Sequence, residues 1–520
     1  MKKGFILILL FLVLLPTISH GEKWQTIGAR AMGMGGTGVA SAKGFAQQYY
    51  NPAFLAIINE EEYNNDIELN INAEIETTDK VLTIIDKVNN LTDKYKDILD
   101  KIANQEYANA IEMMSIMDTL KALQELNVKD VGATVNANTG LGTKLKKLAV
   151  SIRSYAGAGV TPIVDKQNIG LVSSVEGIRI DNFSEPILQD NKKAADIIKT
   201  ALDKYDLTDS FAKLFNLSGK TSQEIANAIV NMTNSASSSV EDIKKMADKI
   251  AEDLPGIEKL VKALISGSYK DNESQVLIDA GVFTEVSVGY GYEIFHGIQV
   301  GGNLKYIQGQ VSQTGIMILS DKENVGKAIT DSLKDTKTTH QIGLDLGALI
   351  DVSKVVGQEI LLSPKFGITA RNINNPYFDR PNKPLDPKYE KIRWNQDRYY
   401  FGNQLRAGIA INPIKKLTVA CDFDLMENKT FVKDFNSQEI SVGAEYLLFN
   451  KKSFCLPLRA GINKNIVSEK SQIEYTFGTG FYTFGFIFEF AAGISKNTAT
   501  FDGNKIPASV STALNLGYAF

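Results

Sequence analysis

The feature that most constrains the fold of this chain is a period-two alternation of apolar and polar residues through its second half. From Ser274 to the C-terminus, segments of about ten residues alternate in this way and are separated by Gly, Asn, Asp and Pro. Successive side chains of a β-strand point to opposite faces, so each segment is expected to be a strand with one apolar face. In one segment Val282 and Val286 share a face, while Glu285 and Ser287 share the other. The region predicts roughly ten or eleven strands.

Such strands fit a soluble sandwich as well as a membrane barrel, and three details favour the barrel. The predicted strands are about nine to eleven residues long, which is enough to cross a bilayer at a tilt. Aromatic residues such as Tyr290 and Tyr446 lie near strand ends on the apolar face, as at a membrane interface. The chain also ends on an amphipathic segment with Tyr518 and Phe520, which resembles the signal read by the outer-membrane barrel assembly machinery.

The first half of the chain supplies fewer strands. We expect one at about residues 65–76, one or two within 147–164 and one near 170–181, for a total close to fourteen. The predicted fold is therefore an all-β transmembrane antiparallel barrel over residues 61–520. If the N-terminus is periplasmic, counting strands up and down places both insertions described next on the outer side.

Two stretches lack the strand pattern and are predicted to be helical insertions, at about residues 78–130 and 185–268. Apolar residues recur there at helical spacing, as in Ile84, Val88 and Leu91 and again in Ile198 and Leu202. The simplest interpretation is that these stripes form the cores of helix hairpins. A groove for a ligand or a partner is the alternative.

Residues 1–21 have the layout of a secretory signal peptide. Lys2 and Lys3 precede an apolar run that Pro16 ends, and small residues near Gly21 predict cleavage after that position. An uncleaved anchor is the alternative, although the apolar run is too short to span a membrane as a helix. The expected location is therefore the outer membrane, reached by export through a cleaved signal peptide.

Residues 22–60 are rich in glycine and alanine, which predicts a segment that can pass through a crowded space or adopt positive φ angles. Small side chains and freely adjustable backbone angles suit a segment that must pass through a crowded space. Pro52 restricts its own φ and keeps Asn51 extended, which makes a corner before the first strand. A flexible linker followed by an ordinary turn is the alternative.

Charged residues on the polar face of the strands are expected to point into the lumen, because hydrocarbon would not accommodate them. Strand neighbours place Arg406 beside Asp422 and Asp424, and Glu445 beside Arg459. We interpret these as ion pairs of the barrel interior, and a ladder that steers substrate is the alternative.

Composition excludes several functions. The formal charge is −4 and becomes −6 when the two signal lysines are removed, so no basic surface for nucleic acid is expected. The chain has 3 histidines, one of them in the signal, which cannot build a metal cluster or a nucleophile triad. Gly33, Gly35 and Gly38 match a dinucleotide-binding pattern, but no strand precedes them. We expect no metal, no cofactor and no enzymatic activity.

Taken together, the chain resembles the long-chain fatty-acid transporter (FadL-like) superfamily of outer-membrane barrels, and most closely its TraF-like conjugal-transfer branch, with PorV-like proteins as cousins. The residues that carry the resemblance are GARAMGMGGTGVASA at 28–42, NPA at 51–53, QLRAGIAINPIKKLTVACDFDLMENK at 404–429 and EISVGAEYLLFNKKSFCLPLRAGINKN at 439–465. The resemblance implies that residues 22–60 plug the lumen and that a hydrophobic ligand rearranges this plug. Carried over to this sequence, the predicted plug and turn residues are Gly33, Gly35, Gly36, Gly38, Asn51, Pro52 and Ala53.

The function expected from these features is a plugged channel for hydrophobic or amphipathic small molecules. One alternative is a non-transporting outer-membrane partner of a secretion or conjugation system, which the large insertions favour. Another is a surface structural barrel. The expected partners are outer-membrane lipid, the barrel assembly machinery, and a hydrophobic ligand or a secreted protein.

Overall fold

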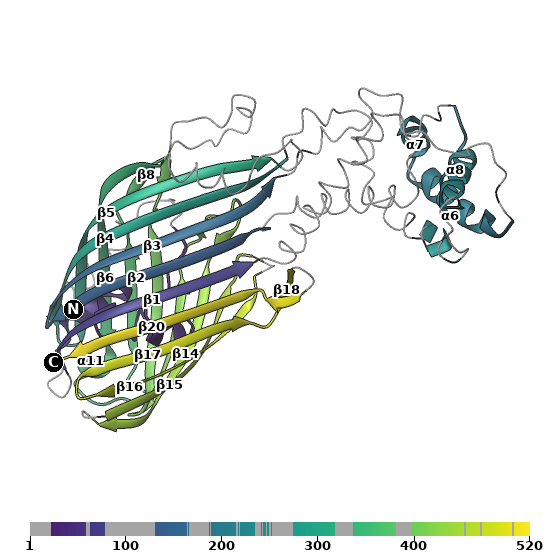
Figure 1. Cartoon of the computed structure of the whole chain (residues 1–520). Helices are drawn as coiled ribbons and strands as arrows, with labels where there is room; N and C mark the ends of the chain where they lie inside the picture. Colours follow the sequence, from purple (N-terminus) through teal and green to yellow (C-terminus); the bar gives the residue numbers. More distant parts are fainter. Residues whose placement is uncertain are drawn as a thin grey trace.

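A closed antiparallel β-barrel of fourteen strands dominates the computed structural model (Figure 1). The structure describes residues 22–58, 63–77, 131–163, 165, parts of 187–251, 274–317, 336–380, 398–451, 454–468, 471–501 and 504–520. In ring order the barrel strands are β1 (Asn65–Thr77), β2 (Ala133–Leu145), β3 (Leu148–Ile163), β4 (Gln275–Phe295), β5 (Ile298–Met317), β6 (Lys337–Asp351), β7 (Lys365–Arg371), β10 (Gln404–Ile414), β11 (Leu417–Asp424), β14 (Glu439–Lys451), β15 (Phe454–Asn465), β16 (Ile473–Thr483), β17 (Phe486–Ser495) and β20 (Ser509–Ala519).

The ring closes between the first strand and the last. Leu69 of β1 lies opposite Leu141 of β2 on one side and opposite Leu516 of β20 on the other. A closed ladder leaves no free sheet edge, which is a requirement for strands that cross a membrane. The predicted barrel and its strand number are confirmed.

Side chains of the barrel alternate between an apolar outer face and a polar lumen. On β4, Val282 and Tyr290 are 50% and 53% exposed, whereas the intervening Glu285 is 1% exposed. An outer surface of exposed Val, Leu, Ile and Phe on every side is far larger than a soluble protein tolerates. The strands therefore present this surface to lipid. Among the described residues, no helix is long and apolar enough to cross a membrane.

The two ends of the barrel differ in their connections. At the end that also holds the C-terminus, most strands are joined by tight turns, and the one longer loop contains the helix α11 (Val352–Val356) (Figure 1). We call this the short-turn end. The other, long-loop end carries three accessory hairpins: β8 (Tyr377–Asp379) with β9 (Arg398–Tyr400), β12 (Asn428–Lys429) with β13 (Asn436–Ser437), and β18 (Thr498–Phe501) with β19 (Asn504–Pro507).

Both segments predicted to be helical insertions begin at the long-loop end, because Thr77 lies opposite Ala133 and Ala133 lies opposite Val160. The first predicted insertion falls outside the described residues. In the second, the structure describes η2 (Gln189–Asn191), α6 (Lys192–Lys204), α7 (Thr208–Leu214) and α8 (Ser222–Asn234), which lie beyond the barrel (Figure 1).

Local sequence explains where α8 begins and why the helices pack together. The side chain of Glu224 accepts a hydrogen bond from the Thr221 backbone N–H at 2.8 Å, and Thr221 Oγ1 accepts one from the Glu224 N–H at 3.3 Å. This reciprocal capping box satisfies N–H groups at the helix start. Ile198 of α6 and Ile225 of α8 are buried, so these helices share a small core.

One strand of the barrel was missed in the sequence. β2 reads Ala-Thr-Val-Asn-Ala-Asn-Thr-Gly-Leu, and its outer face holds small residues beside a few larger ones, so the alternation is weak. The strand predicted near residues 170–181 lies outside the described residues. The span 147–164 forms a single strand, β3.

Eight of the fourteen barrel strands are longer than the nine to eleven residues expected, and three of them by the widest margin. β3, β4 and β5 have 16, 21 and 20 residues. Because a tilted strand of about ten residues already crosses the hydrocarbon, the extra length carries these strands beyond it. Their extensions form one wall of the lumen at the long-loop end.

Candidate functional site in the barrel lumen

Residues 22–57, which we call the N-terminal segment, lie inside the barrel lumen. The segment contains three short helices, α2 (Ala29–Gly33), α3 (Ala46–Tyr50) and η1 (Pro52–Ala56). It runs from the long-loop end, where Glu22 N–H donates to the Phe401 carbonyl, to the short-turn end, where Pro52 approaches Gly301. Nearly all of its residues are buried.

The four predicted plug glycines lie where a side chain would clash or where the backbone favours glycine. A Cβ atom at Gly33 would lie 2.9 Å from Gly478 Cα, and one at Gly38 would lie 2.4 Å from the Tyr50 ring. At Gly35 it would lie 2.5 Å from the carbonyl oxygen of Ile462, and φ is +70°. Gly36 has a φ of +92°. These positions let the segment pack backbone against barrel wall.

Asn51 is the corner of the segment. Its backbone is extended, with φ −162° and ψ 102°, and its Oδ1 accepts a hydrogen bond from the Ala53 N–H at 3.1 Å. Its Nδ2 donates to the carbonyl of Val39 at 3.0 Å and to that of Ala348 in β6 at 2.9 Å. Asn51 and Ala53 are fully buried, and Pro52 starts η1. One amide thus ties the segment to itself and to the wall.

The lumen charges lie next to one another, with one difference from the expected pairing. Arg406 contacts Asp424 at 2.5 Å and Glu439 at 3.1 Å. Asp422 instead accepts hydrogen bonds from the backbone N–H groups of Gly38 and Val39, at 2.7 and 2.9 Å. Asp422 therefore holds the glycine-rich stretch directly, a role that strand register could not indicate.

Glu445 joins the barrel wall to the N-terminal segment. It lies 2.7 Å from Arg459, which also contacts Glu489 at 2.6 Å. Arg30 of α2 binds the same Glu445 carboxylate through two nitrogens, each at 3.0 Å, and Lys43 lies 3.3 Å away. Bidentate arginine–carboxylate contacts are strong and directional, so they set the position of α2.

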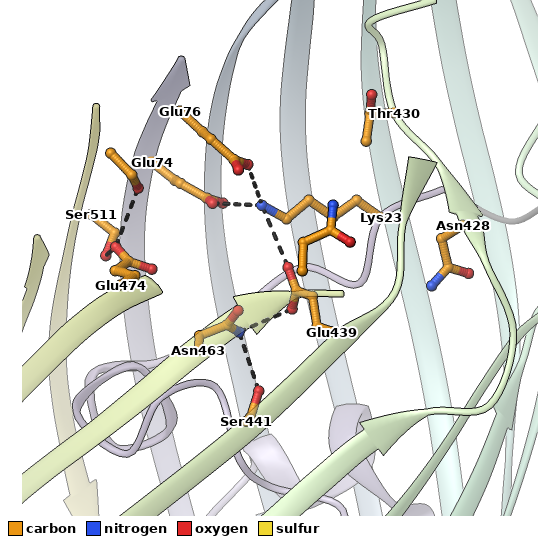
Figure 2. A network of polar contacts seen from close by, with 12 residues as sticks. Lys23, Glu74, Glu76, Asn428, Thr430, Glu439, Ser441, Asn463, Glu474 and Ser511 are labelled. Atoms are coloured by element: carbon orange, nitrogen blue, oxygen red, sulfur yellow. Dashed lines mark hydrogen bonds and ion pairs between the residues drawn. The ribbon is translucent and has the colours of Figure 1, made fainter. Parts of the chain in front are cut away.

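Lys23 makes a second link, at the long-loop end (Figure 2). Its ammonium lies 2.6 Å from Glu74 and 3.1 Å from Glu76, both on β1, and 3.5 Å from Glu439 on β14. Burial disfavours the charged form, but the carboxylates of Glu74 and Glu76 outweigh it and hold the pKa of Lys23 well above its usual value. Lys23 is therefore charged at every physiological pH and bridges strands that are not neighbours.

A narrow cavity separates the N-terminal segment from β3 and β4. Its volume of about 20 Å³ leaves room for little more than a water molecule. Arg153 of β3 lines it, is 3% exposed, and none of its three guanidinium nitrogens has a hydrogen-bond partner. The guanidinium lies over the Tyr49 ring, 4.9 Å from the centroid. A buried, unsatisfied cation facing a cavity marks a place for an anionic group.

Glu285 lies directly opposite Arg153 in the β3–β4 ladder and attracts its charge, but no hydrogen bond joins the two side chains. Arg371 and Lys305 share Glu285 and Asp345, with distances from 2.8 to 3.9 Å. Glu22 also lines the cavity, but burial raises the pKa of its carboxyl group to about 8, and it accepts a hydrogen bond from the Tyr399 hydroxyl at 2.9 Å. It is therefore mostly uncharged at neutral pH.

Aromatic side chains line the long-loop side of this cavity. Tyr155, which borders the cavity, stacks on Phe283 and Phe401 with centroid distances of 5.2 and 5.5 Å. We call this set the aromatic cluster: Tyr155, Phe283, Phe378, Tyr399, Phe401 and Phe431. Phe378 and Tyr399 come from the β8–β9 hairpin, which turns inward. The cavity is thus polar at Arg153 and apolar beside it.

The predicted assembly signal lies at the short-turn rim. Tyr518 and Phe520 are 42% and 50% exposed and stack with a centroid distance of 6.2 Å. The Phe520 N–H donates to the Asn65 carbonyl at 2.9 Å, where the last strand meets the first. Their recognition by the assembly machinery stays a prediction.

Several residues of the site were missed in the sequence. Arg153 follows the alternation of β3, between the outward Ile152 and Ser154, so its lumen position could have been found. Lys23 and Arg30 lie in a segment without periodicity, and nothing local indicates their partners. No group of His, Cys, Asp and Glu able to hold a metal occurs within the described part of the chain.

Comparisons with known proteins place the chain in a family. No curated protein matches it. Among solved structures, the chain is similar to the Ralstonia pickettii toluene transporter TbuX (11% identity, covering 95% of this chain and 98% of that one, TM-score 0.40). It is also similar to the Pseudomonas putida toluene transporter TodX (9%, 96% and 98%, 0.38) and to a Pseudomonas aeruginosa FadL homologue (6%, 96% and 100%, 0.39).

The match to a family model covers most of the sequence. Residues 48–424 match the family described as F plasmid transfer operon, TraF, protein. The matched span reaches from the corner at Asn51 through β11, so it includes the Arg153 cavity and much of the barrel. This chain therefore belongs to the TraF family of the F plasmid transfer operon.

Proposed function

We propose that this protein is an outer-membrane channel for amphipathic or hydrophobic small molecules, closed in this state by its N-terminal segment. The apolar outer face and the closed ring support a membrane barrel, and the predicted signal peptide supports the outer membrane. The observation that carries the proposal is the cavity at Arg153, where an unsatisfied buried cation lies beside the aromatic cluster.

That pairing of chemistry favours a ligand with an anionic head and an apolar tail. The head would accept hydrogen bonds from Arg153, and the tail would pack against Tyr155 and Phe401 of the aromatic cluster. Because the cavity now holds only about 20 Å³, binding requires the N-terminal segment to move. Tyr49, which covers the Arg153 guanidinium, is the part of the segment that a ligand would displace first.

The proposal is tested by the binding of dodecanoate and of uncharged dodecanol to the purified full-length protein in detergent. Charged hydrogen bonds of about 1.5–3 kcal/mol predict that Arg153→Gln weakens dodecanoate binding about 10- to 100-fold. Dodecanol binding should change little. Arg398→Gln, at an exposed arginine of β9, is the matched control. Equal dodecanoate binding by Arg153→Gln and the parent protein would contradict the ligand site.

A second candidate is a non-transporting partner in conjugation, which the family description and the separate helical unit of α6–α8 favour. Deletion of residues 189–234 should then abolish retention of a stoichiometric protein partner from the membrane. Under the channel proposal the same deletion leaves dodecanoate binding intact, so the two readouts separate the candidates.

A further inference from the structure

The loop between β6 and β7 exposes aliphatic side chains at the short-turn end of the barrel. Val355 and Val356 of α11 are 38% and 52% exposed, and Leu361 is 87% exposed. Leu361 is not part of the barrel wall and contributes nothing to the lumen. An aliphatic side chain so fully exposed, in a loop rich in Val and Leu, needs a partner outside the chain.

This loop is held in place rather than projecting freely. The Asp351 N–H donates to the Gly297 carbonyl at 2.8 Å, and the Asn412 N–H donates to the Leu362 carbonyl at 2.7 Å. Within the loop, the Val352 N–H donates to the Pro364 carbonyl at 3.1 Å. The loop therefore lies along the rim, from the β4–β5 turn to the end of β10.

The backbone next to Leu361 adopts an unusual conformation. Leu362 and Ser363 have φ values of 70° and 40°, in the left-handed region that side chains other than Asn and Gly rarely adopt. The hydrogen bonds at both ends of the loop maintain this turn, and the turn places Leu361 outward. A costly turn that exposes a leucine indicates that the leucine has a use.

The exposed aliphatic surface is continuous with the lipid-facing wall. Phe295, at the end of β4, is 62% exposed, and Ile414, at the end of β10, is 56% exposed. These two residues flank the loop on the same rim. The loop thus extends the membrane-facing surface beyond the strands, to the depth where lipid head groups begin.

Positive charge accompanies this surface. Lys415 and Lys416 form the exposed turn after Ile414, and Lys354 lies on α11. On the loop from Asp351 to Lys365, Glu359 is exposed, whereas Asp351 is buried and its carboxylate accepts from the Lys354 N–H. Glu293, near the end of β4, interacts electrostatically with Lys354, so Lys415 and Lys416 carry most of the uncompensated positive charge. Aliphatic side chains with flanking lysines are the composition of segments that bind anionic membrane surfaces.

We propose that this loop is an interfacial anchor, which inserts Leu361 into the bilayer at the short-turn end and binds anionic phospholipid head groups through Lys354, Lys415 and Lys416. The partner is a lipid surface, chosen because the loop continues the lipid-facing wall and carries the complementary charge. The anchor does not depend on what the lumen transports.

Insertion is tested with a tryptophan reporter in the full-length protein, reconstituted in vesicles of phosphatidylcholine and phosphatidylglycerol. Leu361→Trp is compared with Thr200→Trp, on an exposed face of α6, after the emission of the parent protein is subtracted. We expect Leu361→Trp to show blue-shifted emission and quenching by lipids brominated near the head group. Emission and quenching equal to those of Thr200→Trp would overturn insertion.

Lipid preference is tested by counting the phospholipids that stay bound in native mass spectrometry. Each lysine near an anionic surface contributes about 1 kcal/mol, or about fivefold in affinity, so Lys354→Gln/Lys415→Gln/Lys416→Gln should lower the retained phosphatidylglycerol well over tenfold. The control Lys192→Gln/Lys193→Gln/Lys204→Gln makes the same charge change on α6 and should have no effect. Unchanged retention in the rim variant, or no preference in the parent protein, would overturn the lipid assignment. Gel mobility before and after boiling verifies that each variant is folded.

Discussion

At the scale of single residues, close contact between the N-terminal segment and the barrel depends on glycine residues on both surfaces. Gly35 faces the carbonyl of Ile462, and Gly443 of the wall faces the carbonyl of Met34. Neither glycine can gain a Cβ without moving backbone. The charged contacts of Lys23 and Arg30 then hold the segment in place together with its buried aromatic side chains, among them Trp24 and Tyr50.

Gly35→Val should displace the segment while leaving the barrel assembled. The substitution adds a clash with the wall and a strained φ, which together cost on the order of 2–4 kcal/mol. Protease cleavage within residues 22–57 measures the displacement. Gly219→Val is the control, because Gly219 has a similar φ of +83° but no neighbour within 4 Å. Protection of the segment equal to that in the parent protein would show that the close approach does not matter.

Lys23→Met should release the start of the segment. The change leaves Glu74 and Glu76 without their cation, while Glu439 keeps its contact with Arg406, and breaking a buried ion pair typically costs about 3–5 kcal/mol. Hydrogen exchange at residues 23–28 should accelerate by at least about 100-fold. Lys43→Met serves as the comparison, because its ion pair with Glu445 is half exposed and contributes little.

At the scale of elements, the sequence predicts strands best where the outer face carries large residues. All eleven barrel strands after residue 274 fall within the region where alternation was recognised, because lipid selects Val, Leu and aromatic residues on that face. β2 was missed because its outer face is partly small. Contacts across the lumen were not predictable, since Arg30 and Glu445 are 415 residues apart. Strand register indicates neighbours in the wall, not what the wall encloses.

Removal of residues 22–50 should leave a folded barrel that conducts ions. The ring hydrogen bonds do not involve the segment, so the strands can still close, while the lumen loses most of its contents. Conductance in planar bilayers should rise from near zero to discrete open-channel steps. An equally long deletion, residues 192–220, should stay closed. A deletion of 22–50 that conducts no better than the parent protein would place the obstruction in the aromatic cluster.

At the scale of the whole molecule, stability resides in the closed wall. Each of the fourteen strands is hydrogen-bonded to two neighbouring strands. Because the sheet has no free edge strand, unfolding must break the hydrogen bonds between two paired strands. The helical unit and the accessory hairpins all lie at one end, where they can vary without interrupting that sheet. Function and stability are thus carried by different parts of the chain.

The protein should therefore migrate as a compact species in cold sodium dodecyl sulfate and shift to its full apparent mass after boiling. Detergent cannot separate the strands of a closed barrel until heat breaks the hydrogen bonds between them. The deletion of 22–50 should shift in the same way. A single band at the same position with and without heating would contradict an independently stable ring.

Under the proposed function, the position of Lys23 sets the order in which the lumen would open. Lys23 lies at the long-loop end of the barrel, and Asn51 lies near the short-turn end. Release of the N-terminal segment would therefore begin at the ion pairs of Lys23 and proceed towards Asn51. A ligand that enters from the long-loop end meets the ion pairs of Lys23 before other contacts of the segment. Displacement of Tyr49 alone would then uncover Arg153, while the contacts of Asn51 near the opposite end remain in place.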